Sequence, residues 1–137
     1  MRSFPPIRRF AAGCVLALVL AGCAGLIPPP AAVGPARVKS LVEMNWRNPD
    51  FVILDLRGAD DYARGHLQGA VNIPFGTSTF RDELARLDRG KTYVVYCRAG
   101  GLSIETREMM RRMGFSEVTV MEGGYLAWRR AGFRTVR

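Results

Sequence analysis

The chain has 137 residues, with 20 Lys and Arg against 12 Asp and Glu, and a formal net charge of +8. A positive balance favours anionic substrates or a phosphate-rich membrane surface. Nucleic acid is disfavoured as a partner, because no run of basic residues is interleaved with aromatic ones.

The N-terminal segment has the pattern of a targeting signal. Arginines near the start form a basic region, residues 11–20 are apolar, and Leu20-Ala21-Gly22-Cys23 ends the stretch with small residues before a cysteine. These four positions resemble the lipobox of bacterial lipoproteins, which implies a signal peptide at residues 1–22 and a diacylglycerol on Cys23. An uncleaved anchor is the alternative, but the uncharged stretch is at the short limit for a bilayer-spanning helix. Since Ala24 replaces aspartate after the cysteine, the resemblance favours the outer membrane of the cell envelope, with the domain facing the periplasm.

Cysteine use directs attention to one thiol. Cys14 would leave with the signal and Cys23 would carry the lipid, so Cys97 is expected to be the only free thiol of the mature chain. An unpaired thiol in an oxidising compartment is open to oxidation, which favours a functional role for it. One histidine and one free cysteine cannot supply a closed metal site, so no metal is expected.

The rest of the chain predicts alternating helices and strands. Residues 23–36 are rich in Ala, Gly and Pro and predict an extended tether, and residues 37–137 predict one folded domain. Amphipathic spacing predicts helices and short apolar runs predict buried strands. The expected helices are 38–46, 79–87, 103–113 and 124–130, and the expected strands are 51–56, 70–73, 92–96 and 118–121. The alternation predicts an α/β fold, a central parallel sheet flanked by helices, with its site at the carboxyl ends of the strands.

Cys97 closes the expected strand at residues 92–96 and opens the loop C-R-A-G-G-L-S, which ends at Ser103 before a helix. Free backbone N–H groups and the positive end of a helix dipole favour a negative charge, so this setting is expected to lower the pKa of the thiol and give a nucleophilic thiolate. Gly100 and Gly101 are both expected to take φ values that a side chain would resist. A buried, inert cysteine is the alternative for the thiol taken alone.

The loop from Cys97 to Ser103 resembles the active-site loop of the rhodanese family of sulfurtransferases. Two more stretches are similar to signatures of that family: D-L-R-G-A-D-D-Y-A-R-G-H-L-Q-G-A-V-N-I-P at residues 55–74, and Gly114-Phe115 followed by M-E-G-G-Y-L-A-W at residues 121–128. Together they cover residues 51–132. The chain is therefore identified as a single rhodanese-like domain.

The resemblance implies sulfur transfer in two steps. The Cys97 thiolate would take a sulfane sulfur from a donor such as thiosulfate or a persulfide, and a thiol or cyanide acceptor would remove it from the Cys97 persulfide. The backbone N–H groups of the loop would hold the persulfide anion. The expected substrate-binding residues are Arg98, Ala99, Gly100, Gly101, Leu102 and Ser103. No cofactor is implied, and the resemblance names no partner protein.

Two loop side chains leave alternatives open. Ser103 is either a hydroxyl donor to the sulfur or the N-cap of the following helix. Arg98 either supplies a cation to a sulfonate-like group or points to solvent. Many active members of the family carry a cation where this chain has Gly101 and Leu102, so thiosulfate is expected to bind less tightly, by about 1 kcal/mol or more per lost contact. Larger or less charged persulfide donors are expected to bind better beside Gly101 and Leu102.

Five residues of the first signature are expected to support the site. Asp55 and Arg57, with Asp61 and Tyr62, are expected to brace the loop region through an ion pair and hydrogen bonds. His66 is expected to hold the turn before the next strand. A role for it as a general base is disfavoured, because a thiolate of low pKa needs none.

Three other functions share some of these features. A cysteine-type phosphatase also uses a thiolate and an amide loop, but it requires an arginine at the position of Ser103. A non-catalytic binding module of the same fold is the main alternative, although such modules commonly lose the cysteine that this chain keeps. A redox sensor, in which Cys97 forms a sulfenic acid or a mixed disulfide, is the third.

Overall fold

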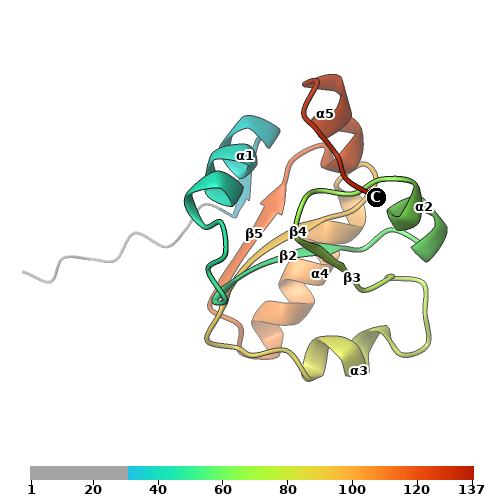
Figure 1. Ribbon diagram of the computed structural model, residues 1–137. Coiled ribbons are helices and arrows are strands. Elements are labelled where there is room, and N and C mark those ends of the chain that lie inside the picture. The colour runs from blue at the N-terminus through green and yellow to red at the C-terminus, as the bar shows by residue number, and fades with distance from the viewer. Residues whose placement is uncertain (1–30) are drawn as a thin grey trace, which may run out of the picture.

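A parallel β-sheet lies at the centre of the computed structural model, in which residues 31–137 are described (Figure 1). Its five strands are β1 (Ala32–Val33), β2 (Phe51–Asp55), β3 (Ala70–Asn72), β4 (Thr92–Tyr96) and β5 (Glu117–Met121). They lie in the order β1-β5-β4-β2-β3, and each neighbouring pair is parallel. The predicted fold, a central parallel sheet flanked by helices, is confirmed.

Helices cover both faces of this sheet (Figure 1). They are α1 (Pro35–Met44), α2 (Ala59–Arg64), α3 (Phe80–Ala85), α4 (Gly101–Arg112) and α5 (Gly124–Arg130). Side chains alternate across β4, so Tyr93 and Val95 pack in one core with α3 and α4, and Val94 and Tyr96 pack in the other with α1 and α5. Burial on both faces explains why the β4 sequence is almost continuously apolar.

The N-terminal boundary of the domain differs from the one expected. Residues 32–33, expected in the tether, form the edge strand β1, which pairs with Val120 and Met121 of β5. Helix α1 begins at Pro35, a residue whose fixed φ suits a first helical position. A strand of two residues has too little pattern to be recognised without its partner. The expected signal peptide, Cys23 and the expected tether up to residue 30 lie outside the described residues.

One further helix and the start of another differ from the sequence prediction. Helix α2 was not expected, because none of its six residues is buried and its sequence shows no apolar stripe. Helix α4 begins at Gly101 rather than at Ser103, because Gly100 takes a left-handed conformation with φ of 107° and serves as the N-cap. The first turn of α4 therefore includes the last three residues of the C-R-A-G-G-L-S loop, Gly101 to Ser103. Within residues 31–137, no helix is long and apolar enough to cross a membrane.

Candidate active site

The thiol of Cys97 lies at the carboxyl end of β4, against the N-terminus of α4. The Gly100 N–H donates a hydrogen bond to Cys97 Sγ at 3.1 Å, and Ser103 Oγ lies 3.6 Å from the same sulfur. The Cys97 residue is only 3% exposed. The sulfur is thus held among backbone donors at the positive end of a helix of 12 residues.

This setting changes the acidity of the thiol. Burial raises the pKa of Cys97, but hydrogen bonds from the Ser103 hydroxyl and from the N–H groups of Ser103, Gly100 and Ala99 act in the opposite direction and lower it below its ordinary value. A lowered pKa increases the thiolate fraction at neutral pH, and the thiolate is the nucleophilic form. The backbone and hydroxyl donors around Cys97 therefore favour the thiolate form.

Ser103 does not cap the helix. It lies inside the first turn of α4, fully buried, and its hydroxyl donates to the Gly100 carbonyl at 2.8 Å. The N-cap alternative for Ser103 is therefore wrong, since Gly100 occupies that position. A hydroxyl has one proton, so Ser103 can donate either to Gly100 O or, after rotation, to the sulfur of Cys97.

Gly100 and Gly101 differ in their backbone conformation. Gly100 has a φ of 107°, and a Cβ built on it would lie 3.3 Å from the backbone nitrogen of Gly123. Gly101 has no positive φ, and a Cβ there would meet nothing within 4 Å. The expectation that both glycines need a left-handed conformation is wrong for Gly101, where the backbone would accept a side chain.

The loop is fixed from its outer side by helix α5. The Tyr125 N–H donates to the Cys97 carbonyl at 2.8 Å, and the Leu126 N–H donates to the Arg98 carbonyl at 3.0 Å. A Cβ on Gly124 would lie 2.4 Å from Cys97 O, closer than any real contact, so only glycine fits there. Because these carbonyls are bound by α5, the loop is held with its N–H groups free to face the sulfur.

A pocket of about 500 Å³ opens beside the thiol. Its walls come from the loops that follow β2, β3 and β4, and it is lined by Leu56, Arg57, Gly58, Ala59, Asp61, Pro74, Phe75, Gly76, Thr77, Cys97, Arg98 and Leu102. Arg98 is exposed and Leu102 is 42% exposed. A volume of this size is in the usual range for small-molecule sites.

A buried ion pair braces the strand ends beneath this pocket. Asp55 is fully buried and accepts hydrogen bonds from Arg57 Nε at 3.0 Å and Arg57 Nη2 at 2.6 Å, and a further one from the Tyr96 hydroxyl. The Arg57 guanidinium also donates to the Gly65 carbonyl at 2.7 Å and lies 3.6 Å from the centre of the Tyr125 ring. Burial, and then the charge of Asp55, raise the pKa of Tyr96 and keep its hydroxyl protonated as a donor.

A family model described as the Rhodanese-like domain matches residues 37–131. The chain belongs to the rhodanese-like family. The matched range contains Cys97, its loop and the ion pair beneath it, so the resemblance seen in the sequence is confirmed for the domain.

Other rhodanese-like proteins and sulfurtransferases are similar to this chain. It is 32% identical over 92 residues to the chloroplastic thiosulfate sulfurtransferase 16 of Arabidopsis thaliana, an alignment that covers 60% of this chain and 77% of that protein. It is 43% identical over 73 residues to a tRNA sulfurtransferase of Pyrobaculum aerophilum, covering 53% of this chain but only 15% of that protein. The crystal structure of a rhodanese-related protein from Thermoplasma volcanium superimposes with a TM-score of 0.66 at 26% identity, covering 78% of this chain and 98% of that one.

The other residues of the first signature hold the rhodanese-like domain together. His66 Nδ1 lies 2.9 Å from the Tyr62 carbonyl, its ring stacks on Tyr62, and its backbone pairs with Val136. His66 does not line the pocket at Cys97. The Tyr62 hydroxyl donates to the Ala70 carbonyl at 2.7 Å. Asp61 is different, because it lines the pocket.

Gly124 and Tyr125 contribute to the site of this rhodanese-like domain, yet they were not singled out from the sequence as site residues. Their sequence signal is the stretch M-E-G-G-Y-L-A-W, residues 121–128, in which two glycines lie at the start of an expected helix. Glycines at a helix start are common in ordinary turns, so only the closeness of Gly124 to Cys97 O shows why glycine is required there. Among residues 31–137, no cluster of three His, Cys, Asp or Glu side chains could hold a metal ion.

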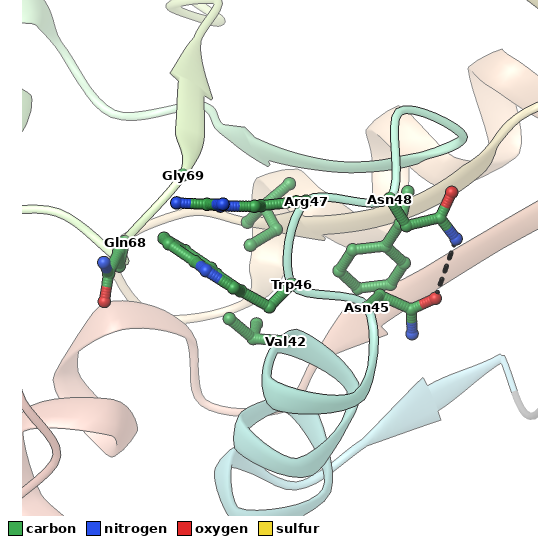
Figure 2. A pocket seen from close by; sticks show the side chains of 9 residues that line it. Val42, Asn45, Trp46, Arg47, Asn48, Gln68 and Gly69 are labelled. Atoms are coloured by element: carbon green, nitrogen blue, oxygen red, sulfur yellow. Dashed lines mark hydrogen bonds between the residues drawn. The ribbon is translucent and has the colours of Figure 1, made fainter.

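A second pocket lies at the opposite end of the sheet (Figure 2). It has a volume of about 250 Å³ and lies between the end of α1 and the start of β2, with the half-exposed Trp46 and the Arg47 side chain beside each other in its wall. Neither Cys97 nor its loop contributes to it. Thiol chemistry in this domain therefore belongs to the pocket at the carboxyl end of β4.

Proposed function

We propose that this rhodanese-like domain is a sulfurtransferase that carries a sulfane sulfur on Cys97. The observation that carries the proposal is the thiol itself: its pKa is lowered, it accepts a hydrogen bond from the Gly100 N–H, and it opens into a pocket of about 500 Å³. A cysteine that only fills space in a core needs neither a lowered pKa nor an opening to a pocket. The names of the sulfurtransferases that align with the chain agree with this reaction class.

The first step transfers sulfur to the protein. With thiosulfate as donor, the Cys97 thiolate attacks the outer sulfur, a new S–S bond forms, and the S–S bond of the donor breaks. Sulfite leaves with the electron pair, and a persulfide anion remains on Cys97. The N–H groups of the first turn of α4 lie next to the position where this negative charge forms, which stabilises the persulfide.

The second step returns the thiolate. A thiol or cyanide attacks the outer sulfur of the persulfide, the S–S bond breaks, and the electron pair stays on Cys97 Sγ. The pocket is open to solvent through exposed Arg98 and Leu102, so an acceptor can reach the same sulfur by the path that the donor used. This sequence of steps has ping-pong kinetics.

Intact mass spectrometry of the purified protein tests this proposal. Incubation with thiosulfate, or with an organic persulfide, is expected to add about 32 Da, one sulfur atom, which cyanide then removes. Cys97→Ser is the control and is expected to gain nothing. If the protein gains no sulfur from either donor, the non-catalytic binding module replaces the sulfurtransferase. If peroxide oxidises Cys97 while sulfur donors leave it unchanged, the redox sensor replaces it.

We further propose that the domain is attached to the cell envelope by a lipid on Cys23, with the outer membrane as destination. The support is the sequence pattern of a basic region, an apolar stretch and Leu20-Ala21-Gly22-Cys23. The described domain begins at residue 31, so only a short stretch of chain separates it from the lipid. The reaction would then take place close to the membrane surface.

A further inference from the structure

The pocket at Cys97 offers two opposite charges to a substrate. The charged side chains that line it, apart from the thiol, are those of Arg57, Asp61 and Arg98. Arg57 is already engaged, since its guanidinium is bound by Asp55 and the Gly65 carbonyl and stacks on a tyrosine ring. The cation and the anion that remain for a substrate are Arg98 and Asp61.

Arg98 is well placed to bind an anionic group. It is exposed, and its guanidinium forms no hydrogen bond and no ion pair with any of residues 31–137. Its backbone is fixed, because the Leu126 N–H holds the Arg98 carbonyl at 3.0 Å. A guanidinium on a fixed backbone next to the nucleophile binds a carboxylate with little loss of backbone entropy.

Asp61 supplies the opposite charge from helix α2. Its side chain is 37% exposed, and one carboxylate oxygen, Oδ1, is bound by Arg64, whose side chain is 71% exposed. An ion pair this open to solvent is weak, and Oδ2 has no hydrogen-bond partner within the described part of the chain. The Arg64 hydrogen bond and, to a smaller extent, the charges of Arg57 and Arg98 lower the pKa of Asp61, so the group is ionised and lies within electrostatic reach of Arg98.

We propose that Arg98 and Asp61 select a zwitterionic donor, the persulfide of an α-amino acid, over thiosulfate. This inference rests on the proposed sulfur transfer at Cys97. The carboxylate of the donor faces Arg98 and its ammonium group faces Asp61, while the sulfur lies over the thiol. Thiosulfate carries two negative charges and no positive one, so Asp61 repels it. A pocket of about 500 Å³ has room for a molecule the size of cysteine persulfide.

The chemical step is balanced without any further reactant. The Cys97 thiolate attacks the terminal sulfur of the neutral persulfide R–S–SH and forms a new S–S bond. The S–S bond of the donor breaks, and the thiolate R–S⁻ leaves with the electron pair, while the proton stays on the transferred sulfur. The product on the protein is Cys97–S–SH.

A set of four donors tests this selection on the full-length protein. The donors are cysteine persulfide, the persulfide of 3-mercaptopropionate without the amino group, the persulfide of cysteamine without the carboxylate, and thiosulfate. The rate of sulfur gain on Cys97, followed by intact mass at limiting donor concentration, is expected to be highest with cysteine persulfide. Loss of either charged group is expected to lower the rate about fivefold, the size of one exposed charge contact.

Variants that remove one charge show which side chain binds the ammonium group of the donor and which binds its carboxylate. Asp61→Asn is expected to lower the rate about fivefold with both amino-bearing donors and to leave the mercaptopropionate persulfide unaffected or faster. Arg98→Gln is expected to lower the rate about fivefold with the two carboxylate-bearing donors and to leave the cysteamine persulfide unaffected or faster. Asp60→Asn is the matched control, since Asp60 lies on the same helix, is exposed and does not line the pocket. Arg64→Gln is expected to increase the preference for an amino group, because it frees Oδ1 of Asp61.

The outcomes separate this inference from the proposed function. Equal rates with cysteine and mercaptopropionate persulfides, or variants that slow all four donors alike, would overturn the selection by Asp61 and Arg98 while leaving sulfur transfer intact. A preference for thiosulfate would overturn it as well. No gain of sulfur from any of the four donors would instead overturn the proposed function itself.

Discussion

Ser103 and Thr106 bring two buried hydroxyl groups to the inward side of α4, and only one of them reaches the sulfur. Ser103 Oγ lies 3.6 Å from Cys97 Sγ, whereas Thr106 Oγ1 has no hydrogen-bond partner within the described residues. Both residues are fully buried. The pair therefore offers a matched comparison of a hydroxyl that contacts the thiol and one that does not.

We expect Ser103→Ala to raise the pKa of the Cys97 thiol, because the variant removes a hydrogen bond that favours the thiolate and leaves the backbone N–H groups in place. A contact worth about 1.4 kcal/mol shifts a pKa by about one unit, which is the upper range expected here. Since a lower pKa means more thiolate at a given pH, the loss moves the midpoint of the alkylation rate against pH to higher pH. Iodoacetamide kinetics measure this shift.

Thr106→Val is the control for that measurement. It removes a buried hydroxyl of the same helix without changing the surroundings of the sulfur, so the alkylation midpoint is expected to stay where it is in the parent protein. Thermal unfolding is expected to show equal or higher stability, since an unpartnered buried hydroxyl is costly. A shift of the same size in both variants would mean that the hydroxyl of Ser103 does not act on the thiol.

At the scale of secondary-structure elements, helix α5 holds the active-site loop in place. Its first turn donates the Tyr125 and Leu126 N–H groups to the carbonyls of Cys97 and Arg98. The ring of Tyr125 also covers the Arg57 guanidinium at 3.6 Å. One short helix therefore joins the loop after β4 to the ion pair at the end of β2, and this contact depends on the absence of a side chain at Gly124.

We expect Gly124→Ala to unfold the site. A Cβ at this position would lie 2.4 Å from Cys97 O and 2.8 Å from Arg98 O, where the neighbours are backbone atoms that cannot turn away. The backbone φ of 57° adds strain of about 1–2 kcal/mol, and the clash adds to it, so the total loss of stability is expected to exceed about 2 kcal/mol. Urea unfolding measures the stability, and sulfur gain on Cys97 measures the site.

Gly132→Ala separates the clash from the backbone strain. Gly132 also has a positive φ, 74°, but a Cβ there would meet nothing within 4 Å. This variant is expected to lose only the strain of about 1–2 kcal/mol and to keep sulfur transfer. If Gly124→Ala were no less stable than Gly132→Ala, the close packing of α5 on the loop would not be what requires glycine.

At the scale of the whole molecule, the order of the strands assembles the pocket. β4 lies between β5 and β2, so the loops after these strands flank Cys97 at the carboxyl edge of the sheet. The loop after β2 brings Arg57 and Asp61 to the pocket, and the loop after β5 brings helix α5 to the back of the active-site loop. The chemistry is thus gathered from segments far apart in the sequence.

The proposed lipid anchor is tested on the whole chain in a bacterial host that processes lipoproteins. With the parent sequence, the protein is expected in the membrane fraction and to incorporate labelled palmitate. Cys23→Ala is expected to abolish the label, because the acceptor sulfur is lost. Label that persists in Cys23→Ala, or a parent protein that never takes up label, would contradict lipid attachment at Cys23.

The sequence by itself determined the features that depend on neighbouring residues. The apolar runs predicted the larger strands, since burial on both faces of a sheet leaves a continuous local pattern. The loop from Cys97 to Ser103 indicated the family and singled out the Cys97 thiol, because a lowered thiol pKa needs only a strand end, a turn and a helix start close together in the chain. The edge strand β1 and helix α2 escaped notice because they are short and carry no such pattern.

Only the tertiary structure decided the features that depend on distant residues. The pairing of β1 with β5, the fit of Gly124 against Cys97 O, and the stacking of Tyr125 on Arg57 join segments separated by tens of residues. The position of Asp61 in the lining of the pocket at Cys97 is of the same kind. Such contacts depend on the order of strands in the sheet and on the space left between packed backbones. A local stretch of sequence predicts neither of these features.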